Sequence, residues 1–232
     1  MQNSTLEKFI KRISQPLYDN GAVNIVCLGD SVTQGAFGPG EIKPEQGYVT
    51  KFAGMLHFLF PNQVFNVINS GIGGTTAAFA KGRFERDVLK FNPDLVLVMF
   101  GVNDFFDAEL YRESLRKIFK ELTEREIPCI YITEHMMNTY VKPDTEESLK
   151  DYAAQTSGVQ NNGTMDAIFE DGKKIAAGFS VPVCDMYSKW KSLNSCGVDT
   201  TALLANGINH PLPEMHTALA YEIISTIFYN KQ

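Results

Sequence analysis

The segment NIVCLGDSVTQG, residues 24–35, starts as an apolar run and breaks off at Gly29, Asp30 and Ser31. A continuous apolar run of this length is typical of a strand buried on both faces, and the polar turn after it is typical of a strand-to-helix junction. Ser31 has two interpretations here. It caps the next helix, because serine is a favoured N-cap residue, or its hydroxyl is a nucleophile at a helix N-terminus. Asp30 can likewise be an ordinary turn residue.

More apolar runs of strand length follow, and helical patterns separate them. The predicted strands cover 22–29, 64–69, 94–101, 128–133 and 181–185, and the predicted helices cover 47–59, 76–90, 107–126, 164–178 and 214–230. Strands that alternate with helices in this way predict a parallel sheet covered on both faces. The sequence therefore predicts an α/β fold, a three-layer α/β/α sandwich around a doubly wound, mostly parallel five-stranded sheet.

The organisation along the chain predicts one domain over residues 1–232, with a helical extension at 1–20. Residues 136–163 have no strong period and are rich in polar and turn residues. Loops of this length are usually functional or mobile. This segment is therefore either a loop that helps to shape a substrate site or a mobile connection.

Composition and charge limit the partners and the compartment that we expect for this chain. The 232 residues carry a formal net charge of -6, which disfavours nucleic acid or an anionic membrane surface as the main partner. The apolar runs are far shorter than the roughly 20 residues of a membrane span, and the N-terminus lacks the apolar core of a signal peptide, so we expect a cytoplasmic protein without stable membrane insertion. The cysteines show no CxxC spacing and are predicted to be buried free thiols of a reducing compartment: Cys27, Cys129, Cys184 and Cys196. Composition does not predict the oligomeric state.

Polar residues follow the predicted strands at their carboxyl ends, where parallel α/β sheets place their sites. Besides the turn at Ser31, these are NSGIGGTT (69–76), GVND (101–104) and TEH (133–135). The glycine cluster lets backbone N–H groups approach a ligand closely, and it lacks the ending of a phosphate-binding P-loop. The side-chain amide of Asn103 is a good oxyanion donor, although Asn-Asp is also common in turns.

A serine nucleophile requires a base, most often histidine. His57 falls within a predicted helix, His135 follows a predicted strand, and His216 falls in the first turn of the last helix. His210 lies in the loop before that helix. Because a loop can carry an imidazole to the strand ends, His210 is the best candidate for the base.

Taken together, GDSVTQG, NSGIGGTT, GVND and NHP resemble, in order, the sequence blocks of the SGNH hydrolases, the GDSL-type lipase and esterase family. The resemblance implies a flavodoxin-like fold and catalysis by Ser31 and His210. It also implies an oxyanion hole formed by the backbone N–H groups of Ser31 and Gly74 and the side-chain amide of Asn103. It implies no metal and no other cofactor.

The sequence departs from the family at the residue that orients the histidine. The family usually has an aspartate three residues before it, where this chain has Gly207, and Asn206 is the nearest polar side chain. Three explanations remain open. A backbone carbonyl accepts the Nδ1 proton of His210, Asp199 or less favourably Asp185 folds in, or the enzyme is weakened, since an Asp-to-Asn change costs about 10⁴ in rate in a serine protease.

The resemblance implies a serine esterase, but the family hydrolyses several kinds of ester and does not by itself fix the substrate. The acidic composition, the lack of a secretion signal and the NGINHP form of the last block favour small acyl, chiefly acetyl, esters such as O-acetylated carbohydrates. A lysophospholipase or lipase-like acylhydrolase is the alternative, because the apolar residues of VNDFFD and EHMMNTY would suit an acyl pocket. Two hypotheses of a different class are a catalytically weakened binding module of the same fold and a nucleotide binder. The candidate substrate-pocket residues are Asp30, Asp104, Phe105 and His135.

Overall fold

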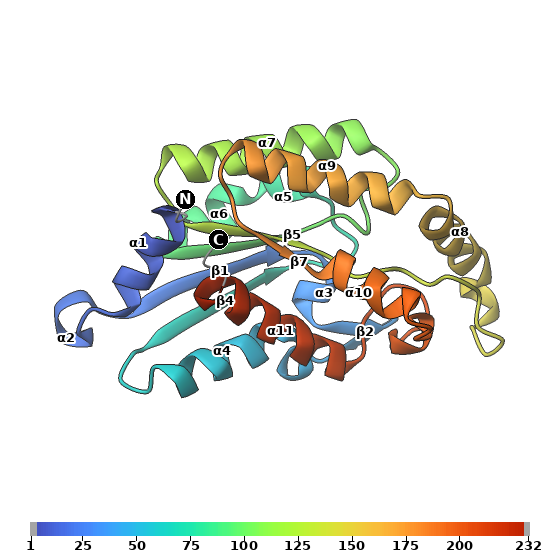
Figure 1. Ribbon diagram of the computed structural model, residues 1–232, viewed down its shortest axis with the longest axis horizontal. Coiled ribbons are helices and arrows are strands. Elements are labelled where there is room, and N and C mark those ends of the chain that lie inside the picture. Colours follow the sequence, from blue (N-terminus) through green and yellow to red (C-terminus); the bar gives the residue numbers. More distant parts are fainter. Residues whose placement is uncertain (1–3, 230–232) are drawn as a thin grey trace.

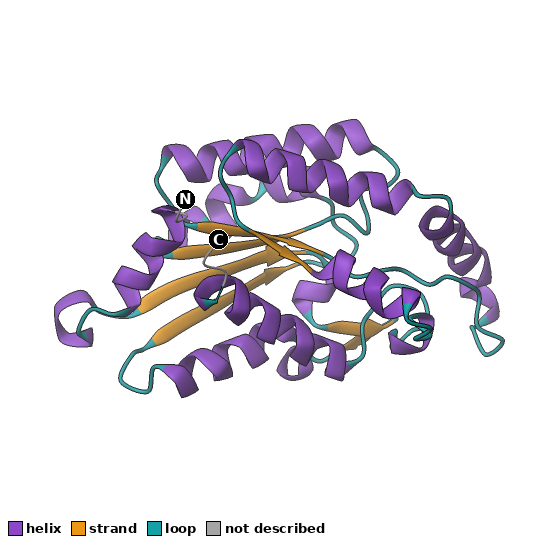
Figure 2. Cartoon of the chain, viewed as in Figure 1, coloured by secondary structure: helices purple, strands orange, loops and turns teal. Residues whose placement is uncertain are grey.

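The computed structural model describes residues 4–229. Residues 1–3 of the predicted helical extension and residues 230–232, which include the end of the predicted last helix, lie outside the described part. A five-stranded sheet forms its centre (Figure 1, Figure 2). All strand pairs are parallel, in the order β4-β1-β5-β6-β7. The strands are β1 (Val23–Gly29), β4 (Phe65–Gly71), β5 (Leu95–Met99), β6 (Cys129–Thr133) and β7 (Val183–Asp185). The predicted doubly wound α/β fold is confirmed.

The strand order alone predicts where a ligand site lies. The chain passes from β1 to one neighbour, β4, and then crosses to the other neighbour, β5. In such sheets ligands bind at the carboxyl ends of the strands where the order reverses. Ser31 follows β1 and Asn103 follows β5, so the topology brings these two residues to the same edge.

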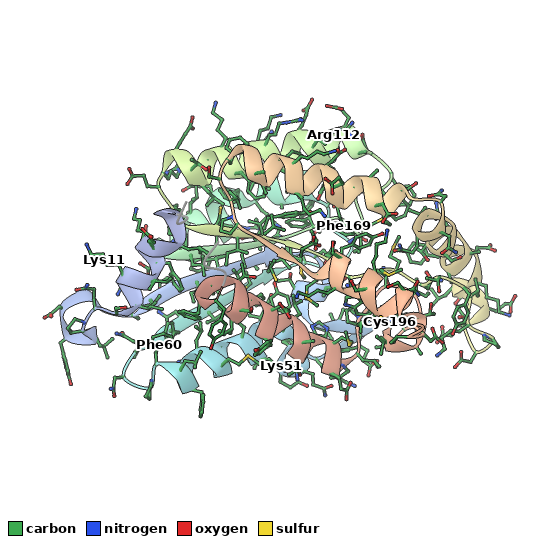
Figure 3. All side chains as sticks on the ribbon, in the orientation of Figure 1. Lys11, Lys51, Phe60, Arg112, Phe169 and Cys196 are labelled. Carbon is green, nitrogen blue, oxygen red and sulfur yellow. The ribbon has the colours of Figure 1, made fainter. Side chains whose placement is uncertain are left out.

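Helices cover both faces of the sheet, as Figure 1 shows. One layer contains α5 (Ala77–Gly82), α6 (Phe84–Asp87), α7 (Ala108–Glu124) and α9 (Thr164–Gly178), and the opposite layer contains α4 (Tyr48–Leu59) and α11 (Pro213–Phe228). Apolar side chains such as Phe169 of α9 are fully buried and point toward the sheet (Figure 3). The N-terminal residues form α1 (Ser4–Ile13) and α2 (Leu17–Asn20), and Phe9 and Ile13 join the core.

Short elements surround the site. A hairpin of β2 (Ala36–Gly38) and β3 (Glu41–Ile42) follows the four-residue helix α3 (Ser31–Gln34), and α10 (Met186–Ser195) follows β7. The remaining pieces are single turns: η1 (Pro44–Gln46), η2 (Leu89–Phe91), η3 (Glu147–Leu149) and η4 (Thr201–Leu203).

Two predicted segments differ in the structure. The predicted helix 76–90 is divided into α5, α6 and η2, because the backbone of Arg83 leaves helical geometry and its guanidinium turns inward to donate to the carbonyls of Gly29 and Ser70. The predicted loop 136–163 contains η3 and the helix α8 (Lys150–Asn161). The helix was missed because its buried face includes the polar side chains Thr156 and Gln160.

The prediction of buried free thiols holds for three of the four cysteines. All four are free, but Cys196, which Figure 3 labels where α10 ends, is exposed. Within residues 4–229, no helix is both long and apolar enough to cross a membrane.

Candidate active site

Ser31 is the first residue of α3, directly after the turn that ends β1. Its interpretation as a helix cap is wrong, because Asp30 is the N-cap residue and its carboxylate accepts from the N–H of Val32 at 3.0 Å. Ser31 is 7% exposed, and its Oγ lies 2.9 Å from Nε2 of His210. The serine hydroxyl and an imidazole are therefore within hydrogen-bonding distance although 179 residues separate them in sequence.

His210 lies on the loop before α11, and that loop is held by backbone hydrogen bonds. The N–H of Ala205 donates to the carbonyl of His210, and the N–H of Gly207 donates to that of Leu204. The carbonyl of Asn209 faces Nε2 of His135 at 2.9 Å. Burial lowers the pKa of His210 from 6.5 to about 4, so the ring is neutral at neutral pH.

Asn206 is the side chain beside Nδ1 of His210, at 3.1 Å from its amide nitrogen. The two aspartates considered for this role lie elsewhere. Asp199 accepts from the hydroxyl of Tyr140, and Asp185 caps α10. Nδ1 faces this amide and not a backbone carbonyl, so the structure does not support orientation of the ring by a carbonyl.

A cavity of about 340 Å³ opens over Ser31 and His210. The glycines at the end of β4 form one wall, and Gly74 has a positive φ of 71°, which suits glycine. The β2–β3 hairpin contributes a second wall. Leu149 and Tyr152, from the segment 136–163, form part of a third. The predicted substrate-shaping segment therefore does border the cavity.

Two residues that line this cavity, Ser31 and Gly74, have backbone N–H groups without a hydrogen-bond partner in the described part of the chain. Among the hydrogen bonds of residues 4–229, none uses the N–H of Gly74 or that of Ser31, which is an unpaired first-turn donor of α3. The neighbouring N–H of Gly73 donates to Oε1 of Gln34 at 2.9 Å and thereby holds the glycine segment against α3. These two free donors lie where the resemblance implies an oxyanion hole.

Asn103 also lines the cavity, but its amide nitrogen has two acceptors already. It donates to Oδ2 of Asp30 at 2.7 Å and to the carbonyl of Thr75 at 3.1 Å. An NH₂ group has two hydrogens, so donation to an oxyanion requires Asn103 to share or release one of these bonds. The longer bond, to Thr75, is the one more easily released.

Three carboxyl groups lie buried beneath Ser31 and Asn103: Asp30, Asp104 and Glu134. Backbone N–H groups hold them, since Ala77 donates to Asp104 and Val102 donates to Glu134. Burial raises the pKa of Asp30 to about 6 and that of Asp104 to about 7, and it raises the pKa of Glu134 strongly.

The four predicted substrate-pocket residues do not line the cavity. Asp30 and Asp104 are buried under it, Phe105 stacks on Phe106 with ring centroids 4.0 Å apart, and His135 packs against Trp190. They were predicted there because they adjoin strand ends, but their side chains turn into the core or away from the opening. His57 lies on the exposed side of α4, and Nδ1 of the buried His216 accepts from the N–H of Tyr48.

Sequence reasoning missed Gln34, Tyr152 and Asn209 as cavity residues. Gln34 belongs to the GDSVTQG block, so its position beside the nucleophile was a usable signal. Tyr152 enters from a helix that the sequence did not predict, and Asn209 donates to its hydroxyl at 3.2 Å. Asn209 belongs to the NHP block, so its position beside His210 was also a usable signal, whereas no pattern in the sequence marks Tyr152.

The protein is an α/β protein with a serine-hydrolase type of site. A serine and a histidine lie within hydrogen-bonding distance at the carboxyl edge of a parallel sheet, beside free backbone N–H groups. A family model described as the GDSL-like lipase/acylhydrolase family matches residues 27–218, and the chain belongs to this family. The resemblance seen in the sequence blocks is thereby confirmed.

Individual relatives give more detail. An acetylxylan esterase of Geobacillus stearothermophilus is 35% identical over 89 residues, which cover 34% of this chain and 39% of that protein. The crystal structure of an acetylxylan esterase from the same organism has a TM-score of 0.68 at 22% identity and covers 90% of this chain and 95% of that chain. A two-domain esterase active on acetylated mannans, co-crystallised with mannopentaose, has a TM-score of 0.72 at 24% identity over 96% of this chain and 52% of that chain.

These structural likenesses show the fold. The sequence matches span less than half the length of the curated relatives.

Proposed function

We propose that the chain is a serine esterase that hydrolyses acetyl esters of carbohydrates. The observation that carries the proposal is the 2.9 Å contact between Oγ of Ser31 and Nε2 of His210, beside the free N–H groups of Ser31 and Gly74. Acetylxylan esterases and an esterase active on acetylated mannans among its relatives support the substrate class.

In the proposed reaction, Ser31 attacks the ester carbonyl while His210 accepts the hydroxyl proton. The N–H groups of Ser31 and Gly74 stabilise the tetrahedral oxyanion, and Asn103 adds its amide if it releases Thr75. His210 then protonates the leaving alcohol. In the second half of the reaction, water attacks the acetyl-enzyme while His210 accepts its proton. His210 then returns this proton to Oγ of Ser31 as the acyl–oxygen bond breaks, and acetic acid leaves.

The apolar residues that suggested the lipase-like alternative do not line this cavity. That alternative depended on apolar residues near Phe105 and Met136 as an acyl pocket, and Met136 and Met137 are buried in the core while Phe105 lies outside the cavity. The cavity has apolar lining residues such as Ile42, Leu149 and Ile208, and polar groups such as Gln34, Asn206 and Asn209 also border it. These polar groups could bind the hydroxyls of a sugar alcohol.

Ser31→Ala tests the proposal. We expect hydrolysis of p-nitrophenyl acetate and of acetylated xylan oligomers to fall by at least about 10³-fold, and labelling by a fluorophosphonate to disappear. The matched control is Ser192→Ala, which removes an exposed hydroxyl on α10. Full activity of Ser31→Ala would refute the mechanism. Preference for long acyl chains in a p-nitrophenyl ester series would refute the substrate class, and a wild type that the fluorophosphonate fails to label would indicate a binding module.

A further inference from the structure

The amide of Asn206 has its orientation fixed by the backbone around it. Its Oδ1 accepts from the N–H groups of Ile208, Asn209 and His210, each at 3.0 Å. A rotated amide would point its NH₂ group at these donors and lose all of the bonds. The nitrogen must therefore be the atom that faces Nδ1 of His210.

Both hydrogens of this amide nitrogen have acceptors. One bond goes to Oδ1 of Asn209 at 2.9 Å, and the other goes to Nδ1 of His210 at 3.1 Å. An amide nitrogen has no lone pair available to accept a proton, so Nδ1 of the ring must be the acceptor. The proton of the neutral imidazole is then on Nε2, where it donates to Oγ of Ser31.

A general base needs the opposite arrangement, with a lone pair on Nε2 and a proton on Nδ1. We infer that Asn206 holds His210 in the Nε2–H tautomer and thereby limits the rate of the reaction. The inference rests on the proposed esterase function and names the residue that restrains it. When His210 accepts the serine proton, Nδ1–H would face an NH₂ donor, so the imidazolium loses a hydrogen bond where an aspartate would give it an ion pair.

No other described side chain supplies that charge. The buried carboxyls Asp30 and Asp104 lie on the side of Asn103, and Asp199 is bound to Tyr140. The ring is also largely removed from water, and its lowered pKa reflects this burial. Asn206 is thus a positioning residue whose chemistry decides which ring nitrogen carries the proton.

The loop around Asn206 is already suited to a carboxylate. Three backbone N–H groups on one oxygen would stabilise its negative charge, and the second oxygen would face Nδ1–H of His210. That second oxygen would also face Oδ1 of Asn209, and two acceptor oxygens repel each other. A half-turn of the Asn209 amide relieves this contact, because its oxygen can then accept from the hydroxyl of Tyr152, to which its nitrogen now donates.

The experiment is a comparison of wild type, Asn206→Asp and Asn206→Ala. We expect Asn206→Asp to raise kcat for p-nitrophenyl acetate by about 10²-fold or more, with a smaller change in KM, because the carboxylate favours the Nδ1–H tautomer and stabilises the imidazolium. Asn206→Ala should lower kcat, because it also removes the three bonds to Oδ1 that hold the loop carrying His210 in place. A purely structural role for Asn206 predicts a loss in both variants, so the opposite signs separate the two explanations.

A spectroscopic measurement reads the tautomer directly. In ¹⁵N-labelled wild type, the NMR shifts of His210 should show a protonated Nε2 and an unprotonated Nδ1, and Asn206→Asp should reverse them. Asn66→Asp makes the same charge change at an exposed site on β4 and should alter neither activity nor the ring signals. Because Asn206 precedes Gly207, intact mass must first confirm that the wild-type amide has not hydrolysed.

Two outcomes would overturn the inference: a wild-type His210 protonated on Nδ1, or a folded Asn206→Asp variant whose kcat is no higher than that of wild type. The ring signals of wild type decide the question even if both variants fail to fold. Retained activity in Ser31→Ala would instead overturn the esterase function, so the two failures are distinguishable.

Discussion

The two sides of the catalytic pair have opposite electrostatic surroundings. On the serine side, Asp30, Asp104 and Glu134 are all buried beneath Ser31 and Asn103. On the histidine side, the hydrogen bonds of the ring within residues 4–229 go to the neutral amide of Asn206 and the serine hydroxyl. In this described part, three acidic groups lie near the place where an oxyanion would form, and none is bonded to the ring that would become a cation.

This difference shows that the buried acids serve the geometry of the serine side. Each accepts from a backbone N–H just after a strand or at the start of a helix, at Val32, Ala77 and Val102. Asp30 also accepts from the amide of Asn103. The acids therefore fix the turns that present the oxyanion donors, whereas the histidine side is fixed by neutral hydrogen bonds alone.

Asn103→Ala should give the largest effect and tests whether the serine side is catalytic. Removal of one oxyanion donor typically costs about 10² to 10³ in kcat, and KM should change less. The measurement is steady-state hydrolysis of p-nitrophenyl acetate. The control is Asn66→Ala, because Asn66 lies at the start of β4, at the edge of the sheet opposite the site. An unchanged kcat would mean that Asn103 keeps its bond to Thr75 throughout and that the backbone N–H groups of Ser31 and Gly74 act alone.

Much of the serine side could be predicted from sequence. Strands buried on both faces give continuous apolar runs, and the polar residues directly after them must meet at one edge of a parallel sheet. This is why Ser31 and Asn103 became candidates by position, whereas the family resemblance supplied Gly74. The capping role was one of the two interpretations of Ser31 and belongs to Asp30, because two adjacent polar residues at a helix start give the same sequence signal.

The histidine side could be predicted only in part. His210 was recognised because a loop can deliver it, but the orientation of the Asn206 amide depends on the backbone positions of residues 208–210, which no spacing rule gives. The helix α8 was missed for a related reason, since its buried Thr156 bonds Asn138 across the structure and hides the apolar period. Hydrogen bonds of polar side chains whose geometry is set only in the folded chain decide these features.

Asp104→Asn should give an intermediate effect, on stability, and tests the burial of acids on the serine side. Burial raises the pKa of Asp104 from 3.8 to about 7, so the folded state holds its proton more tightly than the unfolded state. This carboxyl therefore stabilises the folded protein less as pH rises from about 4 to about 8. Asparagine carries no such charge, and its oxygen can still accept from Ala77.

We expect Asp104→Asn to increase the free energy of unfolding relative to wild type by about 2 kcal/mol more at about pH 8 than at about pH 5. Urea unfolding at the two pH values measures this difference. Asp151→Asn, an exposed acid of α8, provides the same change of charge at the surface. A difference that is equal at both pH values would show that Asp104 is already ionised in the folded protein.

His135→Phe should give the smallest effect and tests whether neutral hydrogen bonds are enough to hold the base. Nε2 of His135 donates to the buried carbonyl of Asn209, the residue before His210, and burial lowers the pKa of His135 to about 3, so the ring stays neutral. Phenylalanine keeps the packing against Trp190 but leaves that carbonyl without a donor, which costs about 1 kcal/mol in stability.

Because the freed carbonyl adjoins the base, kcat of His135→Phe should also fall, by roughly tenfold or less. His57→Phe, on the exposed side of α4, should leave both kcat and stability close to those of wild type. If His135→Phe loses stability while kcat is unchanged, the bonds of Asn206 alone hold the ring. On the histidine side, the neutral amide of Asn206 would then be the one group that positions the base.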